Sequence, residues 1–449
     1  MLFPIPCGLN LLTFAKIRAN IGDFGWKKAG DGRLQMVHAE DQRLIFVYSL
    51  QTKVGALRRI FRCFNFLQVK QRYPAIDIFR GGTVALMILV NNPGSWSTIY
   101  PPLEHASWHG CTPTDLVFPF FLFAMGNSMS FGMTRMKEMP VGEFAAKVLK
   151  RSFLIFAIGL LLNWFPFVQW KNDALVLKSL ANIRILGVLP RLALAYLFAS
   201  FLVYFFNIRK LAAITIGILI AYWLLSLIFG RVPDPYSLEG FWGTAIDRYI
   251  LGPNHIYRGE GVPFDPEGIV STIGAICQVI IGYIAGRKIT SSATDYKLTT
   301  HLFIAGMLCV FSGFCWDLFF PINKKIWTSS FVLYTSGIAL AITATTIYLT
   351  SIRKINTRIT SFFEVFGKNP LFIFVLSGAI PRLLGLVRIK QQDGEKTNFI
   401  TPLSWFYHSV IEPIVSSPYN ASLIYAICMV LFYGAVAYAL DRKKIYIKV

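Results

Sequence analysis

Residues 184–230 read RILGVLPRLALAYLFASFLVYFFNIRKLAAITIGILIAYWLLSLIFG and form two apolar runs, 184–206 and 210–230, with Arg209 between them. Each run has the roughly 20 residues that a helix needs to cross the hydrocarbon core of a bilayer. Similar runs recur along the chain. We therefore expect about ten transmembrane helices, at residues 76–93, 114–133, 149–168, 184–206, 210–230, 268–286, 299–319, 328–350, 361–386 and 422–440. The predicted fold class is an all-α, polytopic transmembrane helical bundle.

Two of these predicted helices contain residues that indicate their local geometry. The ninth, 361–386, is interrupted by the stretch 367–370 (GKNP), which predicts a broken helix. Within this break, Asn369 either satisfies backbone groups that the break frees or faces a cavity. In the sixth helix, the four-residue spacing of Gly282 and Gly286 indicates close helix packing.

The composition excludes other common protein classes. Hydrophobic residues make up 55% of the 449 residues and charged residues only 15%, whereas soluble domains carry nearer a quarter charged residues. Abundant aromatic residues (15%) and the lack of a fixed period exclude a disordered or repeat-built chain. The seven cysteines form no CxxC motif, so we expect small buried hydrophobes rather than redox or metal groups.

The net charge of +21 has two explanations. Basic residues gathered on one face with interleaved aromatics would indicate nucleic-acid binding, but here they form short clusters between apolar runs, as positive-inside loops do. We therefore expect membrane lipid as a partner and no nucleic acid. The first outer loop, 94–113, holds no Lys or Arg, whereas the loops and flanks on the other side hold most of them. This places both termini in the cytoplasm (N-in, C-in) and predicts an integral membrane protein.

Residues 1–72 differ from the rest of the chain. They hold 12 Lys or Arg and four Asp or Glu, with no apolar stretch of spanning length. They also lack the ordered features of a signal peptide. We expect a basic N-terminal appendage at 1–72, which is a soluble tail, an amphipathic surface helix near 54–69 or an over-long gene start, followed by one transmembrane domain at 73–445.

The first outer loop and its flanking helix ends carry the densest polar set, namely Asn91, Asn92, Glu104, His105, Ser107, Trp108, His109, Cys111, Thr112, Thr114 and Asp115. Structural roles are available for its members. Thr112 or Thr114 can cap the next helix, and Asp115 can complement the dipole at its N-terminus. Trp108 can lie at the membrane interface, and a loop histidine can simply be solvated.

His105 and His109 are four residues apart, so on a helix they would share a face and could hold a metal ion. Pro101, Pro102 and Gly110 disfavour a long helix across this stretch. Apart from a glutamate next to His105, no third ligand is close in sequence. We therefore expect no metal site.

Several stretches of the chain together resemble a known family. In chain order they are 77–81 (DIFRG), 89–91 (LVN), 105–110 (HASWHG), 114–120 (TDLVFPF), 187–192 (GVLPRL), 264–269 (FDPEGI), 322–327 (INKKIW) and 367–370 (GKNP). This ordered pattern resembles the catalytic region of the heparan-α-glucosaminide N-acetyltransferase family of transmembrane enzymes. The resemblance implies a bacterial-type homologue in the bacterial inner (plasma) membrane. It lacks the luminal domain and one preceding helix, and 73–445 is its acyltransferase domain.

The resemblance also implies an activity. In the family, an acetyl group passes from cytoplasmic acetyl-CoA to the amine of a glucosamine-like sugar or glycan across the membrane. His105 matches the catalytic histidine, Asn91 the active-site asparagine and Asp115 the acidic partner. The family has Asn where this chain has His109, which leaves open which imidazole acts.

Further site residues follow from these expectations. We expect Trp108, His109 and Glu267 to contact the sugar. A second copy of the chain, in a homodimer, is a further candidate partner. Glu267 ends the outer loop 231–267, whose six acidic residues either attract a cationic amine or are simply solvated.

Acetyl-CoA is the expected cosubstrate, and Arg80, Arg191 and Asn369 are expected to bind it. Arg80 lies one helical turn from Asp77, so it either forms an ion pair or binds the phosphates of CoA. Arg191 lies inside the fourth apolar run. The free-energy cost of a charge at such a position is large enough to indicate a function.

The residue types fit acyl transfer. An amine that attacks a thioester needs a base, and histidine titrates close to neutral pH. The imidazole can instead accept the acetyl group first, in two half-reactions. A carboxylate such as Asp115 would orient the ring, and Asn91 could donate to the developing oxyanion.

Two other kinds of protein share some of these features. A multi-pass transporter of a small solute or glycan precursor would also have interrupted helices and an intramembrane arginine. The absence of inverted repeats and the polar cluster beside an outer loop favour the enzyme. A purely structural subunit has no reason to hold His105 and Asp115 in this context.

Overall fold

The structure is a computed structural model that describes residues 24–28, 34–38, 46–47, 73–355, 357–393 and 396–447. The chain divides into two units, Met1–Arg72 and Tyr73–Val449. In the first unit, β1 (Phe24–Lys28), β2 (Leu34–His38) and β3 (Phe46–Val47) pair in an antiparallel sheet in the order β1-β2-β3. The surface helix expected near 54–69 lies outside the described residues.

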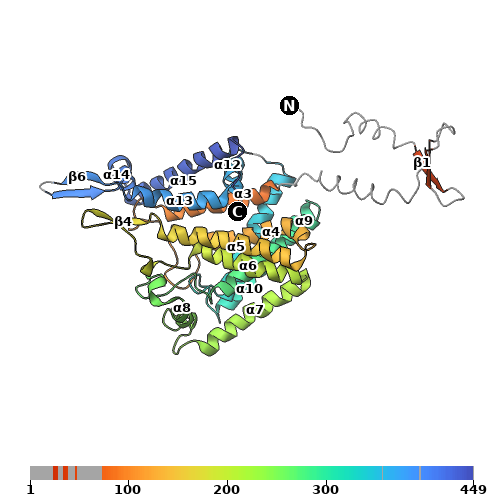
Figure 1. The fold of residues 1–449 in the computed structure, drawn as a ribbon, viewed down its shortest axis with the longest axis horizontal. Helices are drawn as coiled ribbons and strands as arrows, with labels where there is room; N and C mark the ends of the chain where they lie inside the picture. Colours follow the sequence, from red (N-terminus) through yellow and green to blue (C-terminus); the bar gives the residue numbers. More distant parts are fainter. Residues whose placement is uncertain are drawn as a thin grey trace. The chain divides into compact units, whose positions relative to one another are not determined.

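The second unit is a bundle of long helices (Figure 1). They are α3 (Pro74–Asn91), α4 (Val117–Met136), α5 (Val141–Trp164), α6 (Val188–Phe205), α7 (Ile208–Phe229), α9 (Thr272–Ser291), α10 (Tyr296–Asp317), α11 (Ser329–Ile347), α12 (Arg358–Lys368), α13 (Pro370–Leu384) and α15 (Pro418–Arg442). Each of the ten predicted segments overlaps one of these helices, except that the ninth is divided between α12 and α13. The all-α class is confirmed.

Not all ten segments have the composition of a membrane span. Within the described residues, eight helices are long and apolar enough to cross a bilayer, and α12 with α13 makes up to nine. The other predicted segment corresponds to α5, whose first half carries Lys147, Lys150 and Arg151. These charges interrupt the apolar run, so the segment lacks the low charge content of a membrane span. The structure therefore supports a polytopic membrane protein with eight or nine spans by length and composition.

The ninth predicted span is broken, as its sequence indicates. The axes of α12 and α13 differ by 83° across Asn369. Pro370 has no N–H to donate, and its ring disfavours a helical conformation in the residue before it. Accordingly, Asn369 has φ −131° and ψ 49°.

Glycines allow the closest helix crossings. A side chain at Gly81 would collide with the backbone of α12, and one at Gly367 with the backbone of α3. Side chains at Gly282 or Gly286 of α9 would likewise collide with the backbone of α4. The expectation that these last two glycines serve helix packing is confirmed.

The short elements gather at one end of the bundle, on the left in Figure 1. They are β4 (Val168–Lys171), β5 (Ala174–Leu177), α8 (Gly243–Leu251), β6 (Ile389–Asp393), β7 (Lys396–Ile400) and α14 (Pro402–Phe406). They belong to the three long loops that the sequence assigns to the outer side. We call this end of the bundle the outer end; the compartment that it faces stays a prediction from the Lys and Arg distribution.

Candidate active site

Asp115 lies at the entry to α4, where its carboxylate stabilises the start of the helix. It sits in a short 3-10 helix, η4 (Pro113–Leu116), and its Oδ2 accepts the backbone N–H groups of Thr112 and Ala106, both at 3.1 Å. Only 1% of its side chain is exposed. The helix-capping role is therefore real, and it still leaves the second oxygen, Oδ1, for other partners.

His105 uses that second oxygen. Its Nδ1 lies 2.7 Å from Asp115 Oδ1, and half of the imidazole side chain is exposed. The hydrogen bond assigns the proton to Nδ1, because an ionised carboxylate only accepts. Nε2 is then the ring nitrogen that can take a proton from a substrate.

Lys324 completes the cluster from a distant part of the chain, the loop between α10 and α11. Its Nζ lies 3.2 Å from Asp115 Oδ1 and 3.1 Å from His105 Nδ1. A backbone hydrogen bond from Gly110 to Ile322, 2.7 Å long, joins the two loops. Burial lowers the pKa of Lys324, and the charges of Asp115 and Glu267 oppose that shift. We call His105, Asp115 and Lys324 the loop cluster.

Sequence reasoning missed Lys324, although a signal was present. The stretch 322–327 contributed to the family resemblance, but its lysines counted only toward orientation. Two adjacent lysines in a short outer loop contradict the usual depletion of basic residues on that side. Such a departure indicates that at least one of the charges has a specific partner.

His109 and Trp108 have other partners. His109 Nδ1 lies 3.3 Å from the Asn323 side-chain amide, and burial lowers its pKa against the charges of Asp234 and Asp317. Trp108 Nε1 donates to the Tyr236 carbonyl at 2.9 Å, which ties the loop to 231–271. Of the two histidines, His105 is the one with a carboxylate on its ring nitrogen.

The two histidines do not share a helix face. The stretch 104–112 is non-helical, as Gly110, with φ +105°, and the preceding prolines indicate. Within the described part of the chain, no group of three or more His, Cys, Asp or Glu side chains is arranged to hold a metal ion.

Asn91 is the last residue of α3 and is exposed. Among the described residues it has no hydrogen bond to His105 or Asp115. Its role toward an oxyanion stays a prediction.

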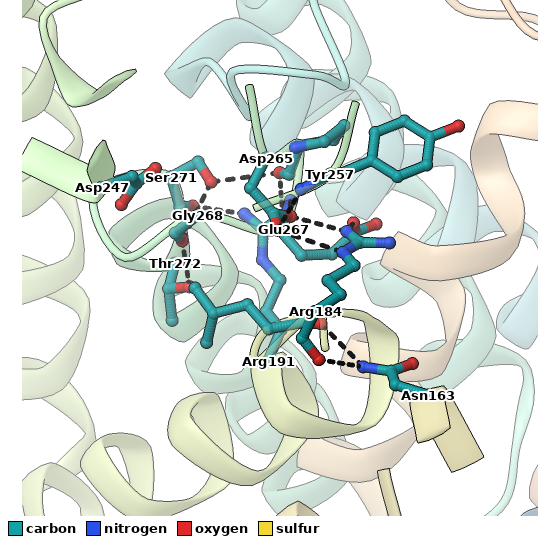
Figure 2. Close-up of polar contacts among 12 residues, drawn as sticks. Asn163, Arg184, Arg191, Asp247, Tyr257, Asp265, Glu267, Gly268, Ser271 and Thr272 are labelled. Carbon is teal, nitrogen blue, oxygen red and sulfur yellow. Dashed lines mark hydrogen bonds and ion pairs between the residues drawn. The ribbon is translucent and has the colours of Figure 1, made fainter. Parts of the chain in front are cut away.

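Glu267 and Asp265 are held by one arginine, Arg184, from the loop that precedes α6 (Figure 2). Arg184 donates to Asp265 at 3.0 Å from Nε and 2.6 Å from Nη2, and it also pairs with Glu267. The Asp265 side chain is fully buried and that of Glu267 is 13% exposed. Burial would raise the pKa of Glu267, but the neighbouring cations, Arg184 first, hold it below its usual range. These two carboxylates are therefore paired inside the protein rather than solvated.

Arg191 is fully buried beside this pair (Figure 2). It donates to the backbone carbonyls of Pro266, at 2.8 Å, and Ser271, and its guanidinium lies 4.2 Å from the centre of the Trp327 ring. It lies near the outer end of the bundle, since Phe118, three residues after Asp115, is also within 5.6 Å. We call Arg184, Arg191, Asp265 and Glu267 the arginine cluster.

Arg80 and Asn369 lie together where α3 crosses α12. Arg80 Nε donates to the Gly367 carbonyl at 2.8 Å, and its guanidinium pairs with Asp77. The Asn369 amide bonds the C-terminal tail, donating to Ile445 and accepting from Ile447, both at 2.9 Å. The ion-pair alternative for Arg80 is thus realised, and the roles of these residues toward CoA stay predictions.

Comparisons with known proteins find similarity to one family of enzymes. Residues 72–238 match the family model for heparan-alpha-glucosaminide N-acetyltransferase, catalytic. The chain is 28% identical over 359 residues to the heparan-alpha-glucosaminide N-acetyltransferases of Mus musculus and Homo sapiens, covering 68% of this chain and 53% and 52% of those proteins. The chain thus spans about half the length of the curated relatives it matches. His105 and Asp115 lie within the matched residues, so the part of the chain that holds the candidate base is similar to the catalytic region of the heparan-α-glucosaminide N-acetyltransferase family.

Proposed function

We propose that this protein is a transmembrane N-acetyltransferase that moves an acetyl group from cytoplasmic acetyl-CoA to the amine of a glucosamine-like sugar or glycan on the opposite side of the membrane. The observation that carries the proposal is the 2.7 Å contact between His105 Nδ1 and Asp115 Oδ1 within the matched catalytic region. It provides an oriented base in a half-exposed position at the outer end of the bundle.

The chemistry assigns a task to each group. In direct transfer, the sugar nitrogen forms a bond with the acetyl carbonyl carbon, the C–S bond breaks, and the electron pair leaves on sulfur. His105 Nε2 takes the proton from the nitrogen and returns it to the sulfur, so that CoA leaves as the thiol. Asp115 holds the ring in the required tautomer and stabilises the imidazolium that forms.

A two-step route uses the same nitrogen. His105 Nε2 attacks the thioester carbon first, the C–S bond breaks, and CoA leaves as the thiolate. The sugar amine then attacks the acetyl carbon, the bond to Nε2 breaks, and the imidazole takes the amine proton and passes it to solvent. In both routes Asp115 fixes the orientation of the His105 ring. The carboxylate can do this because two backbone N–H groups hold its Oδ2 in place.

Lys324 adds a charge at this site. Its ammonium lies beside Asp115 Oδ1 and so offsets the negative charge of the carboxylate that the imidazole contacts. The lysine thus gives the buried carboxylate a partner of opposite charge and helps to keep it in place beside the His105 ring.

Substrate contacts are proposed on the same side. Trp108 and His109 lie in the same loop as His105 and are our candidates for sugar contact. Glu267 is a third candidate, since its charge acts on Lys324. A substrate amine that approached Glu267 would compete with Arg184, which already pairs with it. We therefore weight Trp108 and His109 above Glu267.

The test is an acetylation assay on the purified full chain with radiolabelled acetyl-CoA and a panel of free and oligosaccharide-linked amino sugars. We expect labelled N-acetyl sugar. Unmodified labelled sugar that accumulates inside reconstituted vesicles, without product, would assign the protein to transport instead. Rapid acid-free quenching distinguishes the two routes, because only the two-step route leaves the label on the protein before sugar is added.

A further inference from the structure

A cavity of about 490 Å³ opens at the end of the bundle opposite the loop cluster. It is lined by Thr134, Lys137, Asn207, Ile208, Arg209, Tyr283 and Arg287. These residues come from the end of α4, the start of α7 and the end of α9. Because a helix of 20 residues is about 30 Å long, the cavity is separated from Asp115 by the length of α4.

The lining carries three cations and no acidic residue. Among the residues that the structure describes, Lys137, Arg209 and Arg287 form no ion pair with a carboxylate. Burial lowers the pKa of Lys137, and the positive charge of Arg287 lowers it further. The cations therefore lie close together with their mutual repulsion uncompensated, and a bound anion would relieve it.

Hydrogen bonds hold two of these cations at the rim. Lys137 Nζ donates to the Phe206 carbonyl at 3.1 Å, and Arg287 Nη1 donates to Thr134 Oγ1 at 2.6 Å. An ammonium has three N–H donors and a guanidinium five, so each side chain keeps donors for a ligand beyond its hydrogen bond at the rim. The start of α7 adds the positive end of a helix dipole to the same cavity.

The wall of the cavity continues into an apolar surface. Ile208 lines the cavity and is 42% exposed, and Phe205 beside it is 59% exposed. Only 28% of the apolar window of α7 is buried inside the protein. A ligand with a phosphate and an attached chain could thus place its charge in the cavity and its chain along α7.

We propose that this cavity is a binding site for a phosphate-bearing anion, held by Lys137, Arg209 and Arg287. Phosphate oxygens match the several N–H donors and the three positive charges at this site. Two sources have this chemistry: the headgroup of an anionic phospholipid and the phosphates of a soluble nucleotide such as CoA. The site itself does not depend on acetyl transfer.

The experiment measures both sources on the full chain. The Lys137→Gln/Arg287→Gln double variant is compared with wild type and with Arg135→Gln, which removes one charge from an exposed residue of α4 outside the lining. Retention of phosphatidylglycerol over phosphatidylcholine is followed by native mass spectrometry. Binding of 3′,5′-ADP, which carries two nucleotide phosphates, is followed by calorimetry in detergent.

We expect the double variant to lose at least about tenfold in affinity for one probe, while Arg135→Gln stays within twofold. Loss of phosphatidylglycerol alone assigns the site to lipid, and loss of 3′,5′-ADP alone assigns it to a nucleotide phosphate. Raised salt should weaken the same binding. If the double variant binds both probes as wild type does, or if Arg135→Gln loses as much, the proposal is wrong.

Discussion

The loop cluster and the arginine cluster both lie at the outer end of the bundle, but they differ in how completely their charges are paired. Arg184 bonds two carboxylates whose side chains are 0% and 13% exposed, so that cluster is closed. In the loop cluster a carboxylate that is only 1% exposed supports an imidazole that is 50% exposed. A buried set of ion-paired charges contributes to the specificity and stability of the fold, whereas an anchored imidazole with one exposed ring nitrogen is available for chemistry.

We expect the largest effect from removal of His105, the exposed member of the loop cluster. In His105→Ala the base is removed, and we expect acetyl transfer to fall by about 10³-fold or more. The thermal unfolding temperature should change little, because the side chain is half exposed. His109→Ala is the matched control. Retained turnover in His105→Ala together with its loss in His109→Ala would transfer the role of the base to His109.

Breaking the closed cluster should affect folding instead. Arg184→Met removes the cation that bonds both Asp265 and Glu267, and removal of one partner from such a buried set costs about 3–5 kcal/mol. Thermal unfolding in detergent measures the loss. Lys147→Met, which breaks the exposed pair with Glu143, is the control and should cost less than about 1 kcal/mol. Equal effects of the two substitutions would contradict the contrast between open and closed clusters.

Lys324→Met tests what the charge of Lys324 contributes to the loop cluster. Without the ammonium, the Asp115 carboxylate, which is only 1% exposed, loses the cation that lies 3.2 Å from Oδ1. We expect turnover to fall about tenfold, because a buried carboxylate without this partner holds the His105 ring less firmly. Lys324→Arg keeps the charge and should restore most of the turnover. Wild-type turnover in Lys324→Met, or no recovery in Lys324→Arg, would contradict this role of the charge.

The smallest effect concerns Asp247, which lies next to the arginine cluster (Figure 2). Burial raises its pKa to about 7, against a hydrogen bond from the Ile269 N–H. Between its usual value of 3.8 and about 7, the folded state keeps a proton that the unfolded state has released. Stability should therefore fall as pH rises through this window, and the cost should be complete above it.

Asp247→Asn keeps an acceptor for Ile269 but cannot ionise. We expect wild type to lose on the order of 3 °C in Tm between pH 5 and pH 8 relative to this variant. Parallel Tm profiles for the two proteins would refute the assignment.

Elements that depend on local chemistry were predictable. Apolar runs of about 20 residues correspond to the long helices because lipid offers backbone groups no alternative partners. The break at Asn369 followed from Pro370, and the packing role of Gly282 and Gly286 from their spacing. The expected span at 149–168 differs, since α5 begins earlier, at Val141, and includes a charged first half.

Contacts between distant segments were not predictable in the same way. Asp115 and His105 are ten residues apart, so their pairing was within reach of motif and resemblance. Lys324 reaches them across more than 200 residues, and Arg184 reaches Asp265 across 81. Such pairs depend on which helices pack together, and no local pattern encodes that.

For this protein, the sequence by itself determined a polytopic helical bundle and pointed to His105 and Asp115, because hydropathy, proline and motif spacing act over short stretches of chain. Only the tertiary structure decided which charged or ionisable groups are exposed and which are buried in ion pairs. It paired Glu267 and Asp265 with Arg184, buried Arg191 against Trp327, and brought Lys324 to the candidate base. The physical reason is that the strength and availability of a charge depend on burial and on partners, which helix packing assembles from distant parts of the chain.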